Sequence, residues 1–131
     1  MMRSLIALIG LAFAMPCVSQ DLSSSSASVV EVTPEQVLSM LKDGTFLADV
    51  NEEFTYADAH LPGAKLLVYD AIAADQLPAE KSHPIVFYCY SPECPAAQMA
   101  AESTVRLGYT RVYCMPAGIT GWQDAGLRTE P

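Results

Sequence analysis

The segment that most constrains this chain is a continuous apolar run from Ile85 to Tyr88, which follows Pro84 and ends at Cys89. No polar residue interrupts the run, so both of its faces must be buried. Strands of this kind are typical of parallel sheets that helices cover on both sides. A second run, from Thr45 to Val50, has the same character. The sequence therefore predicts an α/β fold with a mostly parallel central sheet flanked by helices.

Helical signals alternate with these strands. A first helix is predicted to begin after Thr33 and to end before Asp43-Gly44. Its start is marked by Thr33 as the N-cap, by Pro34 at the first helical position and by Gln36 as the capping-box partner of Thr33. A longer helix is predicted from Pro95 to Leu107. The remaining predicted elements are short helices at 52–59, 71–76 and 120–124, a turn at 61–64, and strands at 66–69 and 111–115.

The first nineteen residues have the pattern of a secretory signal peptide. Arg3 is their one charge, an apolar run follows from Leu5 to Phe13, and small residues precede Ser19. The run is shorter than the ~20 apolar residues that a transmembrane helix requires. Cleavage is expected after Ser19, with Ala14 as the alternative site and a lipid anchor at Cys17 as a further option. An exported protein, periplasmic or secreted, is therefore expected.

Residues 20–31 are rich in serine and are expected to form a flexible leader, which assigns the folded domain to residues 32–131. Removing residues 1–19 takes away Arg3 and no acid, so the formal net charge changes from −8 to −9. Such an acidic domain argues against nucleic-acid binding and against contact with an anionic membrane after signal cleavage. A monomer is the expected state.

Three cysteines remain after cleavage: Cys89, Cys94 and Cys114. An odd number in an oxidising compartment leaves at least one without a partner in the chain. Their spacing does not match a structural zinc site, and no metal or cofactor is expected. Cys114 falls inside the predicted strand 111–115, so we expect it to be buried and inert.

Cys89 stands where a buried strand ends and a short loop leads to the helix that begins at Pro95. Ligands of open α/β sheets bind outside the carboxyl ends of the strands. A helix N-terminus favours an anion and lowers the pKa of a nearby thiol. The pattern is that of a nucleophilic cysteine, with an inert buried cysteine as the alternative.

Five segments, in order, resemble the rhodanese family of sulfurtransferases, and together they extend from about Thr33 to Gly126. They are Leu-Ala-Asp-Val at 47–50, Ala-His-Leu-Pro-Gly-Ala at 59–64, Ile-Val-Phe-Tyr-Cys at 85–89, the helix end and strand at 107–113, and Ala-Gly-Ile-Thr-Gly-Trp at 117–122. The resemblance implies a rhodanese-like fold.

The resemblance places Cys89 on the family's nucleophile. Its thiolate would attack the outer sulfur of a donor such as thiosulfate, sulfite would leave, and a thiol or cyanide would take the sulfur from the Cys89 persulfide. The loop that would bind the substrate through backbone N–H groups comprises Tyr90, Ser91, Pro92, Glu93 and Cys94. Structural roles are implied for Asp49, His60, Gly63, Gly118 and Trp122, while His83 is expected to be solvated.

The chain departs from the family pattern at two positions. Cys94 and Asn51 stand where family members often carry arginine. Pro95 occupies the position at which related phosphatases carry their arginine, which argues against phosphatase activity. Two alternatives therefore stay open beside sulfur transfer: a thiol–disulfide redox module in which Cys94 resolves an oxidised Cys89, and a non-catalytic binding module.

Overall fold

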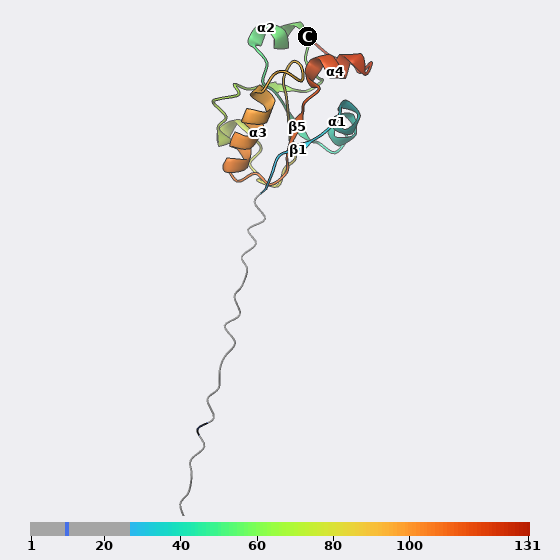
Figure 1. The fold of residues 1–131 in the computed structure, drawn as a ribbon. Coiled ribbons are helices and arrows are strands. Elements are labelled where there is room, and N and C mark those ends of the chain that lie inside the picture. The colour runs from blue at the N-terminus through green and yellow to red at the C-terminus, as the bar shows by residue number, and fades with distance from the viewer. Residues whose placement is uncertain (1–9, 11–26) are drawn as a thin grey trace, which may run out of the picture.

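The computed structural model describes residue 10 and residues 27–131, and it places five parallel strands of these residues in one sheet. The spatial order is β1-β5-β4-β2-β3 (Figure 1). Every neighbouring pair is parallel, which confirms the predicted α/β class. The strands are β1 (Val30–Glu31), β2 (Phe46–Asp49), β3 (Lys65–Leu66), β4 (Ile85–Tyr88) and β5 (Val112–Met115).

Helices cover both faces of this sheet. In Figure 1, α3 (Ala96–Arg106) lies on one side of the strands and α1 (Pro34–Leu41) on the other. The predicted capping box starts α1, since the Thr33 hydroxyl accepts from the Gln36 N–H and the Gln36 side chain accepts from the Thr33 N–H. The shorter helices are α2 (Glu53–Asp58), the 3₁₀ helix η1 (Ala74–Gln76) and α4 (Gly118–Asp124).

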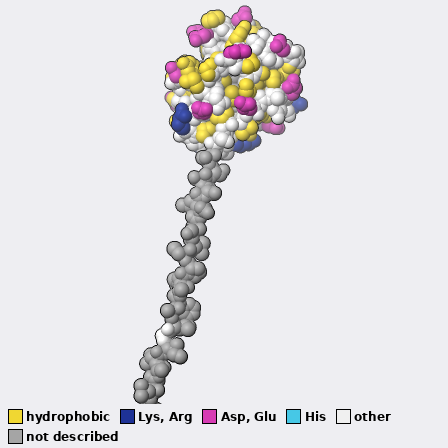
Figure 2. Space-filling view, in the orientation of Figure 1, with side chains coloured by type: hydrophobic (Ala, Val, Ile, Leu, Met, Phe, Trp, Pro, Cys, Tyr) yellow, Lys and Arg dark blue, Asp and Glu magenta, His cyan; other side chains and the backbone are white. Residues whose placement is uncertain are grey.

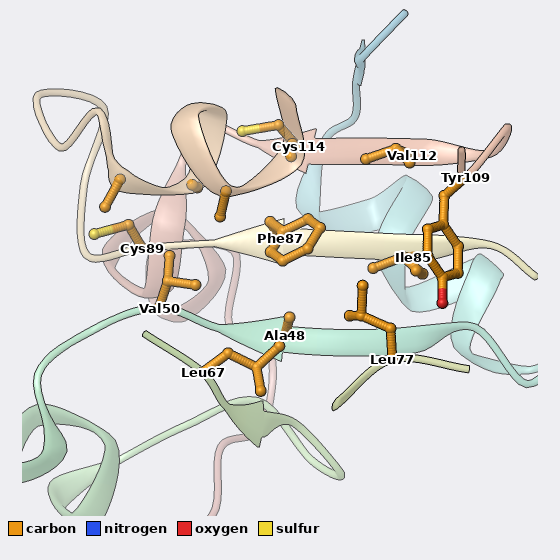
Figure 3. Packing of buried hydrophobic residues seen from close by; sticks show 14 residues of the cluster. Ala48, Val50, Leu67, Leu77, Ile85, Phe87, Cys89, Tyr109, Val112 and Cys114 are labelled. Carbon is orange, nitrogen blue, oxygen red and sulfur yellow. The ribbon is translucent and has the colours of Figure 1, made fainter. Parts of the chain in front are cut away.

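The central strand β4 is buried along its whole length and supplies side chains to two cores. Ile85 and Phe87 belong to the core beneath α3, and Cys89 continues the same face just beyond the strand (Figure 3). Val86 and Tyr88 point to the opposite core, which contains Trp122. This alternation follows from the pleat, and it assigns Cys89 and Tyr88 to different faces of the sheet.

The sheet begins earlier in the chain than the sequence suggests. Val30 and Glu31 pair with Tyr113 and Cys114 of β5, so the end of the predicted leader 20–31 is a strand and the fold starts before residue 32. The strand expected at 66–69 is instead β3, which ends at Leu66. The predicted signal peptide, residues 1–19, lies outside the described residues apart from Gly10. Among the helices that the structure describes, none is long and apolar enough to span a membrane.

The C-terminal tail folds back onto the turn after α2. Glu130 and His60 exchange two backbone hydrogen bonds of 2.8 and 2.9 Å, as an antiparallel bridge. The Glu130 carboxylate also accepts the Gly63 N–H at 2.9 Å. The Trp122 indole N–H donates to the Arg128 carbonyl, which ties the same tail to α4. The tail therefore holds the Leu61-Pro62-Gly63 turn in place.

Removing residues 129–131 should lower the free energy of unfolding by about 1–3 kcal/mol, because the bridge and the Gly63 hydrogen bond are lost together. Urea denaturation of the purified protein measures this loss. The control is Glu130→Gln, which keeps the backbone bridge and an oxygen acceptor and should be close to wild type. Equal midpoints for the truncated and full chains would show that the tail contributes nothing.

Candidate functional site

Cys89 lies at the carboxyl end of β4, beneath the N-terminus of α3, and is 5% exposed (Figure 3). The loop that follows it is held from the other side by the start of α4. The Ile119 N–H donates to the Cys89 carbonyl, and the Thr120 N–H donates to the Tyr90 carbonyl, both at 3.0 Å. The loop therefore has a fixed path between two helix N-termini.

Gly118 is the point at which α4 approaches this loop most closely. Its φ of +65° lies in the left-handed region, which favours glycine. A Cβ atom at this position would lie 2.5 Å from the backbone carbon and oxygen of Tyr90. Only glycine allows α4 to pack against the loop in this way.

The structure joins Cys89 and Cys94 in a disulfide, with their Cα atoms 6.3 Å apart. The sequence alone leaves this pairing open. In this state Cys89 carries no thiol, and the Cys94 N–H donates to the Ser91 carbonyl within the loop. The Cys94 amide is therefore turned to the loop itself, rather than inward as the predicted cradle of N–H groups requires.

A hydrogen-bonded network reaches Cys89 from β2. Asp49 is fully buried and accepts three hydrogen bonds: from the Tyr88 hydroxyl at 2.5 Å and from the backbone and side-chain N–H groups of Asn51, both at 2.8 Å. The Tyr88 oxygen in turn accepts the Leu61 N–H at 3.0 Å. Since its amide nitrogen is held by Asp49, Asn51 turns its carbonyl oxygen toward Cys89, 3.7 Å from Sγ.

The ionisable groups of this network are perturbed by burial. Loss of solvent raises the pKa of Asp49, and the hydrogen bonds from Tyr88 and Asn51 partly oppose that shift. Burial, together with the Asp49 carboxyl, raises the pKa of Tyr88 well above its ordinary value. Tyr88 therefore stays a hydrogen-bond donor to Asp49 rather than a source of protons for chemistry.

The two histidines occupy sites away from the sulfur atoms. His60 is buried, stacks on the Tyr56 ring at 3.8 Å between centroids, and has Nδ1 2.8 Å from the Tyr56 carbonyl oxygen. It lies beside the 61–64 turn. His83 is half-buried and has Nε2 2.9 Å from the Gly44 carbonyl oxygen, so the expectation that it is simply solvated is wrong. Trp122 is 1% exposed within the core.

Cys114 is buried on β5 and is the free cysteine among the described residues. It lies on the α3 face of the sheet, as Cys89 does (Figure 3). Burial, and secondarily the Glu31 carboxylate, raises the pKa of the Cys114 thiol to about 11. At neutral pH this thiol is protonated and a poor nucleophile.

Two cavities open onto the disulfide. One, of about 280 Å³, lies toward β1 and β5 and is lined in part by Glu31, Gln98 and Cys114. The other, of about 350 Å³, lies toward α2 and is lined in part by Glu52 and Tyr69. Within the described part of the chain, no three His, Cys, Asp or Glu side chains are grouped to hold a metal ion. Both cavities reach the sulfur atoms of Cys89 and Cys94.

This geometry agrees with comparisons to known proteins. The family model for the rhodanese-like domain matches residues 33–125. The chain belongs to the rhodanese-like domain family. It is 30% identical over 100 residues to the thiosulfate sulfurtransferase GlpE of Haemophilus influenzae (strain PittEE), covering 76% of this chain and 93% of that protein. The GlpE protein of Pseudoalteromonas translucida is 33% identical over 91 residues, 69% of this chain and 85% of the relative.

The rhodanese-like fold is also seen among solved structures. The crystal structure of a Bacillus halodurans protein matches with a TM-score of 0.68 and 25% identity, covering 77% of this chain and 76% of the other. Together with the family match, this similarity makes the rhodanese fold the architecture of the domain.

In the sequence, Asn51 stands out only as a departure from the family pattern, and Tyr88 has no role beyond the strand. The structure places both in the network that reaches Cys89. The burial of β4 could have pointed to Tyr88, because a hydroxyl group on a fully buried strand needs a polar hydrogen-bond partner. Nothing in the sequence could have shown that Asn51 is oriented by Asp49, because that depends on how β2 ends beside β4.

Substituting Gly118 by alanine should lower the free energy of unfolding by about 2–4 kcal/mol, because the new Cβ adds a collision with the Tyr90 backbone to the cost of a positive φ. The matched control is Gly126→Ala, whose φ is +74° but whose Cβ would meet no atom within 4 Å. That variant should lose only about 1 kcal/mol. Urea denaturation of both variants measures the two losses in the free energy of unfolding. Equal losses would show that the loop at Tyr90 moves to accommodate the new Cβ atom without further cost.

Proposed function

We propose that this protein is an exported sulfurtransferase that carries sulfane sulfur as a persulfide on Cys89. The observation that carries the proposal is the position of Cys89, at the carboxyl end of a buried parallel strand and beneath a helix N-terminus, in a chain of the rhodanese-like family. The relatives named thiosulfate sulfurtransferase support the same reaction class. Asp49, His60, Gly63, Gly118 and Trp122 serve this reaction by holding the strand ends, the turn and the loop.

The reaction begins once the disulfide to Cys94 is reduced. The Cys89 thiolate attacks the terminal sulfur of the donor, a new S–S bond forms on Cys89, and the donor's own S–S bond breaks. With thiosulfate, sulfite leaves with the electron pair of that bond. An acceptor thiolate, or cyanide, then attacks the outer sulfur and restores the Cys89 thiolate. The positive end of α3 favours each anionic form of Cys89.

Cys94 adds a second outcome to the same chemistry. Its thiolate can attack Sγ of the Cys89 persulfide, so that the Cys89–Cys94 disulfide forms and hydrosulfide leaves with its electron pair. The disulfide in the structure favours this route, because it shows that the two sulfur atoms can reach each other within the fold. A thiol reductant must then open the disulfide before another turnover. The thiol–disulfide function thus becomes a branch of sulfur transfer.

Export is part of this proposal. Its support is the signal-peptide pattern of residues 1–19, and a disulfide agrees with an oxidising compartment. The monomeric state stays a prediction.

Replacing Cys89 by serine should abolish persulfide formation, since serine cannot hold sulfane sulfur. Purified protein is reduced, freed of reductant, and incubated separately with thiosulfate and with cysteine persulfide. Intact mass should show the gain of one sulfur atom, and cyanide should then release thiocyanate. Cys114→Ala is the control and should keep the adduct, because Cys114 is buried and protonated. Absence of both an adduct and released hydrosulfide in the wild-type protein with both donors would refute sulfur transfer.

Replacing Cys94 by serine should stabilise the persulfide. In the wild-type protein without acceptor, the adduct should decay while hydrosulfide is released and two thiols disappear. Cys94→Ser should retain the adduct and release at least about tenfold less hydrosulfide in the same time, because the attacking thiolate is gone. A hydrosulfide assay with thiol counting follows both products. Equal release from the two proteins would assign the decay to solvent or to another thiol, and Cys94 would have no resolving role.

A further inference from the structure

The cavity toward α2 offers more than access to the disulfide. It has a volume of about 350 Å³, and its lining includes both cysteines of the disulfide, Cys89 and Cys94. Around them lie the apolar or aromatic side chains of Val50, Tyr69 and Met99. Such a volume suits the body of a small organic molecule, whereas an inorganic anion would fill only part of it.

Large apolar side chains at the mouth of this cavity are exposed to solvent. Tyr69 is 36% exposed, Met99 46% and Tyr90 54%. The apolar surface continues into a neighbouring depression that shares Val50 and Tyr69 and adds Val68, which is 59% exposed. Exposed apolar side chains that gather around a concave site mark a surface that is covered by a ligand.

Charge around the disulfide opposes anions. Neither of its two cavities has a lysine or arginine among its described lining residues, and each has one glutamate, Glu31 in one and Glu52 in the other. Glu93 on the loop accepts a hydrogen bond from the Ser91 hydroxyl, which lowers its pKa and keeps it ionised. The visible face in Figure 2 likewise shows more acidic than basic side chains. Thiosulfate, a dianion, would meet these carboxylates and no lysine or arginine among the described residues that line either cavity.

We infer that this cavity binds the organic body of an apolar sulfur donor, an aryl or alkyl persulfide or thiosulfonate that carries at most one negative charge, in preference to inorganic thiosulfate. The inference rests on the proposed function of Cys89. The Cys89 thiolate attacks the sulfane sulfur of the donor, the S–S bond of the donor breaks, and an organic thiolate or sulfinate leaves with its electron pair. Tyr69 and Met99 contact the organic body, and Glu52 disfavours a second negative charge.

The test compares benzenethiosulfonate with thiosulfate as donors to the reduced protein. Persulfide formation is followed as the sum of the intact-mass adduct and the hydrosulfide that Cys94 releases from it. Each rate constant is divided by that of free cysteine with the same donor, which removes intrinsic reactivity. The normalised rate for benzenethiosulfonate should exceed that for thiosulfate by at least about tenfold, since an apolar contact of this size discriminates to that extent. A normalised rate for thiosulfate that equals or exceeds it overturns the inference.

Variants identify the cavity as the cause. Tyr69→Ser and Met99→Gln should each lower the ratio of the two rates about fivefold, and Glu52→Lys should raise the thiosulfate rate. The control is Leu38→Gln, which changes an exposed apolar residue of α1 outside the cavity and should keep the wild-type ratio. If neither Tyr69→Ser nor Met99→Gln changes the ratio, the organic body binds elsewhere and the inference is wrong.

Ionic strength provides an independent reading. Between about 0.01 and 0.1 M salt the screening length falls from about 30 Å to about 10 Å, so the thiosulfate rate should rise more than the benzenethiosulfonate rate. A thiosulfate rate that falls with salt would indicate attraction and would contradict the inference. Failure of both donors to give either an adduct or hydrosulfide would instead refute the proposed function, so the two failures are distinguishable.

Discussion

The burial of β4 on both faces is the constraint on which the rest of this structure depends. Because the pleat sends successive side chains to opposite sides, Tyr88 must enter one core and Cys89 must follow Phe87 toward the other. A strand shifted by one residue would exchange these two side chains. The sulfur atom would then face Asp49, and the tyrosine hydroxyl would enter an apolar core without its partner. The register of one strand therefore places the Cys89 sulfur atom and the Asp49–Tyr88 hydrogen bond on opposite faces of the sheet.

Asn51 links Asp49 and Cys89, which lie on opposite faces of the sheet. Asp49 lies on the same side of the sheet as Tyr88, yet Asn51, two residues later, reaches around the end of β2 to Sγ of Cys89. Its carbonyl oxygen can accept a hydrogen bond from a thiol or a protonated persulfide, and it offers nothing to a bare thiolate. The N-terminus of α3 has the opposite preference. The amide oxygen of Asn51 and the N-terminus of α3 therefore offer the sulfur atom of Cys89 opposite surroundings.

Much of this fold could be predicted from the sequence because its central elements are specified locally. The apolar run of β4 and the capped start of α1 at Thr33 both appear where expected. Elements that depend on distant partners could not be predicted so well. Val30 and Glu31 form a strand only because they can pair with the edge of β5. The serine-rich sequence before them predicts a flexible leader, so this strand is not expected from the sequence. The site divides in the same way. The place of Cys89 follows from its position after a strand, whereas the positions of Asn51 beside Sγ and of Tyr69 in the cavity wall arise from segments that meet only in three dimensions.

The third thiol shows how one cavity can contain three cysteines and still form a single disulfide. Cys114 lines the cavity toward β5 together with Cys89 and Cys94. Thiol–disulfide exchange requires a thiolate, but burial and the nearby Glu31 carboxylate raise the pKa of Cys114 to about 11. At pH 7 roughly one molecule in ten thousand would carry the Cys114 thiolate, since each unit of pKa changes the ratio about tenfold. Glu31 belongs to β1, so the strand that the sequence conceals also helps to keep Cys114 out of exchange with the Cys89–Cys94 disulfide.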